Sequence, residues 1–339
     1  MTYRIDERLL HFKQPAGTSR GVYTTRKIWL IHLSDGQRTG VGECAPLPDL
    51  SCDALPDQEY ISILNKVCKD FCQSSGIDYD SLRDYPSMLF GLETALLNLQ
   101  NGDRLFDTAF SRGETGIPIN GLVWMGNHDE MLQRLEEKLE KGFRCIKLKI
   151  GAIDFDQELD LIRRIRDRFS FHEVELRVDA NGAFPYDEAL YKLELLSQYN
   201  IHSIEQPIKA GQWAFMADLC RESPLPIALD EELIGVNDPA MKRHMLNIIK
   251  PRYIILKPSL HGGMAGCREW IETARDLGIG SWITSALESN IGLNAIAQFA
   301  ASIYGDHITL PQGLGTGQLF TDNIPMPLEI RNDQLWRCL

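Results

Sequence analysis

From residue 117 onward, short apolar runs alternate with longer amphipathic stretches. The apolar runs have the length of buried strands and the amphipathic stretches have the period of helices, so each pair indicates one β/α unit. Eight such strands favour a closed, TIM-like barrel of the α/β class over an open sheet, and no GxGxxG motif follows the first strand. The predicted strands are Ile117–Leu122, Cys145–Ile150, Val174–Val178, His202–Ile204, Ile227–Leu229, Tyr253–Leu256, Ser281–Thr284 and His307–Leu310. The predicted helices include Asp129–Lys141, Phe155–Phe169, Tyr186–Tyr199, Gly263–Leu277 and Ile291–Tyr304.

The N-terminal third of the chain has a different order of elements. Asp35-Gly36 is a hairpin signal, and residues 14–21 are rich in Pro, Gly and small polar residues, which is typical of a loop. Strands followed by helices indicate an α+β domain. We therefore predict an α+β domain over residues 1–115, a barrel over 116–318 and a C-terminal segment, 319–339, that returns to the first domain. The predicted elements of the first domain are strands Tyr3–His11, Lys27–Leu33 and Gln37–Cys44 and helices Gln58–Cys72 and Pro86–Leu99.

A charged residue stands at the carboxyl end of five successive barrel strands, 25 to 30 residues apart. Each short motif around them is ordinary on its own, as a strand edge, a turn or a helix start. Because the carboxyl ends of barrel strands surround one mouth, where active sites of such barrels lie, the repetition indicates a functional site. The five residues are Lys149, Asp179, Glu205, Asp230 and Lys257.

Three carboxylates on neighbouring strands would repel one another, and a divalent cation removes that repulsion. Oxygen ligands suit Mg²⁺ or Mn²⁺, so we expect Asp179, Glu205 and Asp230 to be metal ligands. A substrate carboxylate on such a cation has an acidified α-proton, because the cation stabilises the enediolate that forms. Lys147 is a neighbouring cation that would lower the pKa of Lys149 and make it a base.

Other polar residues near these strand ends allow more than one interpretation. Glu231 is expected to orient Lys257 or a metal ligand, with a plain surface acid as the alternative. Arg177 is expected to lie behind the metal ligands and support them. The glycine-rich run Gly313–Gly317 fits either close contact with a ligand or a flexible exit from the barrel.

Charge and composition narrow the range of partners. The chain has 35 Lys and Arg against 47 Asp and Glu, a net charge of −12, which argues against nucleic acid or an anionic membrane as the partner. It has no run of 18 apolar residues, and its first residues lack the features of a signal peptide. The cysteines form no CxxC pair or zinc pattern. We therefore expect a cytoplasmic enzyme with a small-molecule carboxylate substrate, and the oligomeric state stays open.

The ordered motifs resemble the muconate-lactonizing-enzyme branch of the enolase superfamily over nearly the whole chain. Within that branch, residues 285–293 (SALESNIGL) and 313–316 (GLGT) are most similar to the o-succinylbenzoate synthases of menaquinone biosynthesis. The resemblance implies a (β/α)₇β barrel, an α+β capping domain and a C-terminal segment that returns to the cap. The motifs are Lys147-Leu148-Lys149, Asp179-Ala180-Asn181, Glu205-Gln206-Pro207, Asp230-Glu231 and Lys257-Pro258-Ser259.

The resemblance also implies roles for individual residues. Asp179, Glu205 and Asp230 would bind the metal, Lys149 would be the acid and base, and Lys257 would stand on the opposite face of the substrate. The segment from Lys13 to Tyr23 matches the mobile cap loop of the family. Four further residues would lie near the substrate, namely Lys147, Asn181, Ser285 and Gly313.

The implied reaction is a Mg²⁺-dependent syn elimination of water from 2-succinyl-6-hydroxy-2,4-cyclohexadiene-1-carboxylate. Lys149 would remove the α-proton and return a proton to the departing hydroxyl, while the ammonium of Lys257 stabilises the enediolate. An N-acylamino acid racemase or a dipeptide epimerase of the same superfamily is the alternative. Residues 313–317 contain no acidic Asp-x-Asp, which argues against the epimerase. A non-catalytic metal-binding protein on the same scaffold is a third, weaker hypothesis.

Overall fold

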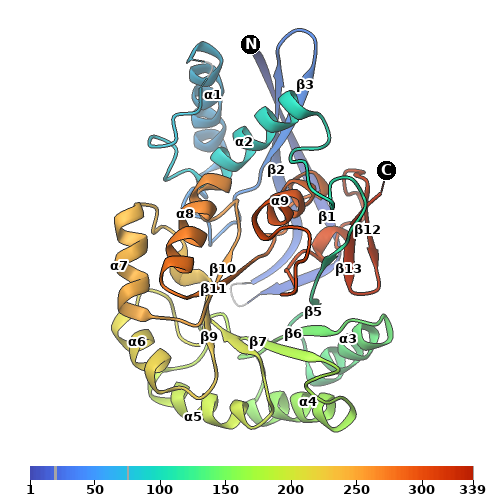
Figure 1. Cartoon of the computed structure of the whole chain (residues 1–339), viewed down its shortest axis with the longest axis vertical. Helices are drawn as coiled ribbons and strands as arrows, with labels where there is room; N and C mark the ends of the chain where they lie inside the picture. The colour runs from blue at the N-terminus through green and yellow to red at the C-terminus, as the bar shows by residue number, and fades with distance from the viewer. Residues whose placement is uncertain (19–20, 75, 339) are drawn as a thin grey trace.

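The computed structural model describes residues 1–18, 21–74 and 76–338. In the N-terminal part, strands β1 (Thr2–Thr18), β2 (Gly21–Ser34) and β3 (Thr39–Cys44) form an antiparallel sheet in that order, and helices α1 (Asp57–Ser74) and α2 (Pro86–Asn101) pack on it (Figure 1). A Cβ atom at Gly42 would lie 1.9 Å from the Gly91 carbonyl oxygen of α2. Glycine therefore lets the helix lie directly against β3.

The predicted loop at residues 14–21 is wrong for the residues that the structure describes. β1 continues to Thr18 and β2 begins at Gly21, with Ala16 paired to Tyr23, while residues 19 and 20 lie outside the described residues. The register shifts between His11 and Ala16, a stretch that contains Pro15. Proline cannot donate to a sheet, so it fits at such an irregularity, and the partner strand overrides the local loop preference.

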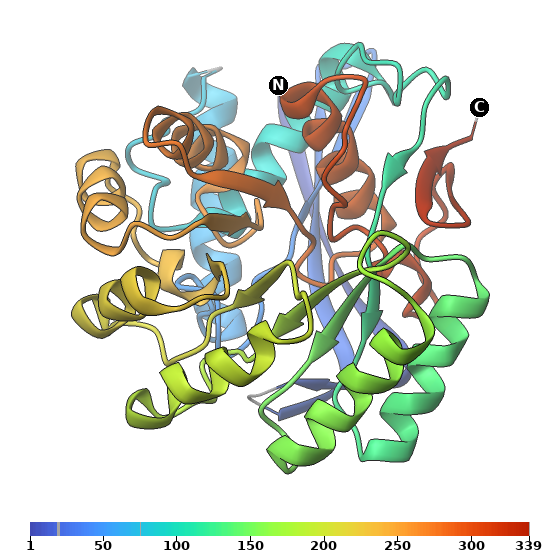
Figure 2. The ribbon, with the colours of Figure 1, turned by 60° about the horizontal axis from the view of Figure 1, so that its bottom comes forward.

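Most of the remaining chain forms a parallel barrel with helices outside the strands, which confirms the predicted fold class (Figure 2). The sheet has the order β11-β10-β9-β8-β7-β6-β5. Its strands are β5 (Gly121–Val123), β6 (Cys145–Lys149), β7 (Glu175–Asp179), β8 (Ser203–Glu205), β9 (Ile227–Leu229), β10 (Tyr253–Leu256) and β11 (Gly280–Ile283). The helices are α3 (His128–Glu140), α4 (Phe155–Arg168), α5 (Tyr186–Ser197), α6 (Trp213–Glu222), α7 (Pro239–Ile249), α8 (Gly263–Asp276) and α9 (Asn290–Tyr304).

The eighth barrel strand differs from its prediction. Residues 307–310 form no strand; instead Gln312 and Gly313 make parallel bridges to Ile119 and Thr284, at the two edges of the seven-stranded sheet. A Cβ atom at Gly313 would lie 2.0 Å from Thr284 Oγ1, so only glycine fits this close approach. The apolar pattern misplaced the strand because closure uses backbone groups of a glutamine and a glycine.

The first predicted barrel strand is divided in two. β4 (Ile117–Pro118) pairs with the C-terminal strand β13 (Gln334–Arg337), and only β5 belongs to the barrel sheet. β13 also pairs with β12 (Leu328–Arg331). Between the barrel and this hairpin, Phe320 forms a bridge to Phe12 of β1. The C-terminal segment thus contacts both the N-terminal sheet and the start of the barrel.

The largest apolar core fills the space between the barrel strands and their helices, and a second core lies between α1, α2 and the N-terminal sheet. α9 is apolar on nearly all sides because it is buried between the barrel and the N-terminal part. Within the described residues, no helix has both the length and the apolar composition needed to span a bilayer.

Candidate active site

The register of the parallel strands brings the predicted charged residues together. Lys149 is paired with Asp179, and Asp179 with Glu205, at the carboxyl ends of β6, β7 and β8. Lys149 Nζ donates to Asp179 Oδ2 at 2.6 Å and to Asn181 Oδ1 at 2.7 Å. Lys147 Nζ lies 2.8 Å from Asp179 Oδ2 and 2.5 Å from Glu205 Oε2. Both ammonium groups therefore contact Asp179, and Lys147 also contacts Glu205.

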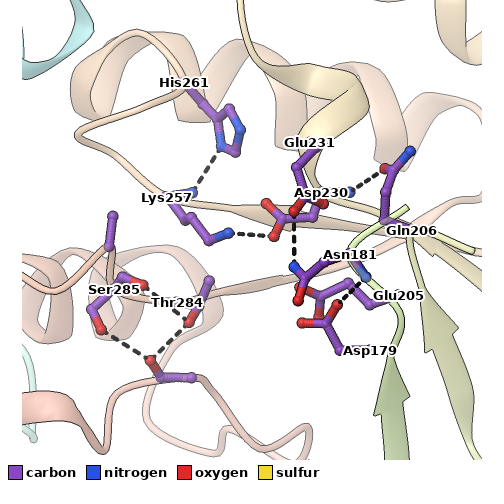
Figure 3. Close-up of polar contacts among 12 residues, drawn as sticks. Asp179, Asn181, Glu205, Gln206, Asp230, Glu231, Lys257, His261, Thr284 and Ser285 are labelled. Carbon is purple, nitrogen blue, oxygen red and sulfur yellow. Dashed lines mark hydrogen bonds and ion pairs between the residues drawn. The ribbon is translucent and has the colours of Figure 1, made fainter. Parts of the chain in front are cut away.

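A third ammonium group approaches from β10. Lys257 follows the last residue of that strand, and its Nζ forms an ion pair with Asp230 Oδ2 (Figure 3). The backbone N–H of Lys257 donates to His261 Nδ1 at 2.9 Å, which holds the start of the loop in place. The three lysine side chains are 13–14% exposed, whereas Asp179, Glu205 and Asp230 are at most 4% exposed.

Amide side chains connect the acidic residues from behind. Asn181 Nδ2 donates to Glu231 Oε1 at 2.8 Å, and Gln206 Oε1 accepts from the backbone N–H groups of Asp230 and Glu232 at 3.3 and 3.2 Å (Figure 3). Asn181 and Gln206 have φ of 46° and 41°, a left-handed conformation that costs energy in most residues. Such strain is concentrated at functional sites. Gln206 and His261 have no role that their positions in the sequence predict, since only the folded chain brings them into these contacts.

The pKa values of the acidic residues shift in different directions despite equal burial. Burial would raise the pKa of Asp179, but the ammonium groups of Lys147 and Lys149 outweigh it and hold that pKa well below its usual range. Burial and the charge of Asp179 raise the pKa of Glu205 well above its usual range. Burial would lower the pKa of Lys147, but Asp179 and Glu205 outweigh it and raise that pKa. Further positive charge at this site would favour the ionised form of Glu205.

Asp179, Glu205, Asp230 and Glu231 form an acidic cluster, and some of its carboxylate oxygens remain available as metal ligands. Glu205 Oε1, Asp230 Oδ1 and Glu231 Oε2 are buried and have no hydrogen-bond partner among the described residues. Buried charged oxygens without partners are costly, and carboxylate oxygens are preferred ligands of hard divalent cations. Across the described ranges, no three His, Cys, Asp or Glu side chains are grouped as metal ligands, and Lys147 bridges Asp179 and Glu205. The unpartnered carboxylate oxygens are the type of ligand that fits a hard divalent cation.

A cavity of about 610 Å³ lies over this cluster. The β1–β2 hairpin contributes Phe12, Lys13 and Tyr23 to its wall. Lys13 to Tyr23 is the segment that the family resemblance predicts as a mobile cap loop. Seven of the residues singled out from the sequence also line it: Lys147, Lys149, Asn181, Glu231, Lys257, Ser285 and Gly313. The volume is that of a small-molecule site.

Arg177 and Ser285 occupy different surroundings. Arg177 lies one layer below Asp179 in the barrel, where it contacts Glu175 Oε1 at 2.7 Å, the Pro311 carbonyl at 2.9 Å and the ring of Trp282. Ser285 lies at the mouth, and its hydroxyl is 2.6 Å from Thr316 Oγ1. The prediction that Arg177 supports the metal ligands therefore finds no direct contact in the described residues.

Comparison with known proteins agrees with this geometry. Residues 130–335 match the family model of the enolase C-terminal domain-like proteins, and residues 18–99 match that of the MenC N-terminal domain. The chain is 46% identical to the o-succinylbenzoate synthase of Desulfotalea psychrophila, over 97% of this chain and 96% of that protein. It is 27% identical to the o-succinylbenzoate synthase of Haemophilus influenzae, over 83% of this chain and 80% of that one.

The solved structures include a near relative of similar length. The crystal structure of MenC from D. psychrophila superimposes with a TM-score of 0.83 and 41% identity, and the match covers 98% of this chain and 99% of that one. Family membership also implies a metal-dependent enzyme. The chain therefore belongs to the o-succinylbenzoate synthase family of the enolase superfamily.

Proposed function

We propose that the protein is a carbon–oxygen lyase that dehydrates 2-succinyl-6-hydroxy-2,4-cyclohexadiene-1-carboxylate to o-succinylbenzoate, in the cytoplasm and as a step of menaquinone biosynthesis. The 46% identity to a synthase of that name supports the substrate. The observation that carries the chemistry is the pair of ammonium groups, Lys149 and Lys257, which contact the acidic cluster from different strands and line one cavity. We also infer that residues 1–115 act as the cap, 116–318 as the barrel and 319–339 as a segment that joins the two.

In this proposal, Asp179, Glu205 and Asp230 hold Mg²⁺, with Mn²⁺ as a substitute. The unpartnered oxygens of Glu205 and Asp230 support this assignment. When bound, the cation supplies positive charge where negative charge develops on the substrate carboxylate. Glu231 and Asn181 hold one another and thereby fix the edge of the acidic cluster.

The protein's own residues move the protons. Lys149 accepts the α-proton and then donates a proton to the departing hydroxyl on the same face of the ring. The ammonium of Lys257 stabilises the negative charge that remains in the ring after the first step. Lys147 neutralises charge beside Asp179, and Ser285 and Gly313 shape the far wall. The β1–β2 hairpin covers the cavity and reduces access of water.

Racemisation of N-acylamino acids is the second candidate. One observation favours it: lysines from β6 and from the end of β10 both reach the acidic cluster, so each face of a substrate could meet an amine. Exchange of the α-proton with solvent deuterium from both enantiomers of an N-acylamino acid would support this activity.

A spectrophotometric assay decides between these functions. The cyclohexadiene carboxylate is supplied with Mg²⁺ or Mn²⁺, with or without EDTA, and loss of the diene absorbance is followed. We expect rapid loss that EDTA abolishes and that added Mg²⁺ restores. No loss of absorbance, with Mg²⁺ binding shown by calorimetry, would contradict the dehydratase proposal and favour the racemase.

A further inference from the structure

A buried arginine joins the N-terminal sheet to the mouth of the barrel. Arg26 lies on β2, is 2% exposed, and directs its guanidinium toward two separate segments. In the N-terminal part it donates to the carbonyls of Ala45, at 2.6 Å, and Pro46. In the loop between β11 and α9 it donates to the carbonyls of Leu287, at 3.2 Å, and Ala286, at 3.4 Å.

The contacts match the number of donors. A guanidinium has five N–H groups in a rigid fork. Arg26 meets five backbone carbonyls, since its NH1 also reaches the Lys27 carbonyl at 3.5 Å. Lysine has only three donors on a single nitrogen and could not hold two segments in this way.

Arg26 is held by backbone carbonyls and, among the described residues, by no direct ion pair. Burial lowers its pKa, and the nearby charges of Glu288 and Glu43 act against that effect. Both carboxylates are used elsewhere: Glu288 accepts from the Ala286 N–H and the Ser259 hydroxyl, and Glu43 accepts from the N–H groups of Ser289 and Gly292. The N–H groups of the guanidinium are therefore available to donate to the backbone carbonyls.

The segment that Arg26 holds is strained. Leu287 has a φ of 64°, a left-handed conformation that is unfavourable for a bulky side chain. A strained conformation persists only where its surroundings enforce it. Arg26 holds the carbonyls of Ala286 and Leu287, which belong to the two peptide groups that flank Leu287. Glu288 holds the Ala286 N–H. These hydrogen bonds enforce the strained conformation.

Ala286 and Leu287 form part of the cavity wall. Both line the cavity that contains Lys149 and Lys257, and both pack in one apolar cluster with Leu47 and Leu260. Arg26 itself does not line that cavity. It acts from behind the wall, so it cannot contact a substrate directly.

We propose that Arg26 is a positioning residue that fixes the Ala286–Leu287 wall of the active site to the N-terminal domain and thereby sets substrate affinity. The proposal rests on the proposed function, because that function supplies the substrate. If the wall is already fixed, less conformational entropy is lost when the substrate binds. Loss of Arg26 therefore weakens substrate binding more than it slows the chemical step.

Steady-state kinetics of two variants test this role. Arg26→Lys keeps the charge but loses the fork, and Arg26→Ala loses both. We expect KM for the cyclohexadiene carboxylate to rise about tenfold or more in Arg26→Lys, with kcat changed less than about threefold. Millimolar guanidinium should lower the KM of Arg26→Ala, whereas methylammonium should not. Arg8→Ala, an exposed arginine on the neighbouring strand, is the matched control.

Amide hydrogen exchange measures the local opening of the Ala286–Leu287 wall in the absence of substrate. We expect the amides of residues 284–292 to exchange faster in Arg26→Lys than in the wild type, while those of α7 do not change. A lowered melting temperature with unchanged KM and unchanged exchange in residues 284–292 would overturn the proposal. A wild-type protein that does not turn over the substrate would overturn the proposed function instead, and the exchange result would still decide the role of Arg26.

Discussion

Two sets of buried acidic residues occupy different settings in this molecule. The mouth acids, Asp179, Glu205 and Asp230, contact lysine ammonium groups. Glu205 and Asp230 also keep one oxygen each without a hydrogen-bond partner among the described residues. The junction acids, Glu43 and Glu93, come from the N-terminal domain and accept hydrogen bonds at the amino ends of barrel helices. Glu93 accepts from the N–H groups of Met264 and Ala265 in α8, and Glu43 from those of Ser289 and Gly292 at the start of α9.

The difference lies in what kind of partner each set has. At the junction, burial outweighs the uncharged hydrogen-bond donors, which are backbone N–H groups and the Ser289 hydroxyl, and raises the pKa of Glu43 and of Glu93 to about 7. At the mouth, lysine ammonium groups hold the pKa of Asp179 and of Asp230 below the usual range despite equal burial, whereas burial and the charge of Asp179 raise the pKa of Glu205. Amide donors satisfy a carboxylate geometrically, whereas ammonium groups also keep it ionised. The junction acids therefore join the N-terminal domain to the barrel helices, whereas the mouth acids lie against positively charged side chains.

The largest effect on activity should follow removal of Lys149, the residue that transfers protons in the proposed reaction. Lys149→Ala should lower kcat for dehydration by about 10³-fold, because general acid–base groups contribute about 10²- to 10⁴-fold. Asp179 keeps its ion pair with Lys147, so the fold should persist. Stopped-flow or steady-state loss of diene absorbance, with circular dichroism, measures both. Lys66→Ala, on the exposed face of α1, serves as the control; a Lys149→Ala protein that keeps a tenth of wild-type activity would refute the assigned role.

A smaller effect is expected in thermal stability: substitution of a mouth acid, but not of a junction acid, should remove the stabilisation of the folded protein by Mg²⁺. A ligand that binds only the folded chain at 100 times its Kd adds about 2.7 kcal/mol to the free energy of unfolding. We expect Mg²⁺ to raise the melting temperature of the wild type and of Glu93→Gln, but to have little effect on Glu205→Gln. Differential scanning fluorimetry measures all three. An unchanged Mg²⁺ response in Glu205→Gln would remove Glu205 from the ligand set.

The sequence indicated the mouth acids but not the junction acids, for a physical reason. The mouth residues repeat with the β/α unit, and parallel register places them together without knowledge of any loop. The junction contacts join residues 171 to 249 positions apart, with no periodic pattern to reveal them. Arg26 was missed for the same reason, since its partners are backbone carbonyls that no side-chain pattern encodes. The closing strand at Gln312 and Gly313 was missed because it lacks apolar residues.

The smallest predicted effect concerns the pH dependence of stability at the junction. A carboxyl group whose pKa is higher in the folded chain than in the unfolded chain adds stability at low pH and loses it as pH rises through the folded value. For Glu93, with a usual pKa of 4.5 and a folded value of about 7, that loss runs from about pH 4.5 to 7. Glu93→Gln should therefore gain about 2 kcal/mol relative to the wild type between about pH 5.5 and 7.5. Urea unfolding at several pH values measures this difference.

The control for this prediction is Glu59→Gln, an exposed glutamate on α1, whose unfolding free energy should run parallel to that of the wild type at each pH. Glu43 provides a second test of the same idea at α9, because its burial raises its pKa to the same value. Parallel pH profiles for Glu93→Gln and the wild type would mean that the backbone N–H groups of Met264 and Ala265 keep Glu93 ionised as effectively as lysines keep Asp179 ionised. The contrast between the junction and the mouth would then rest on the unpartnered oxygens of the mouth alone, and not on its positive charge.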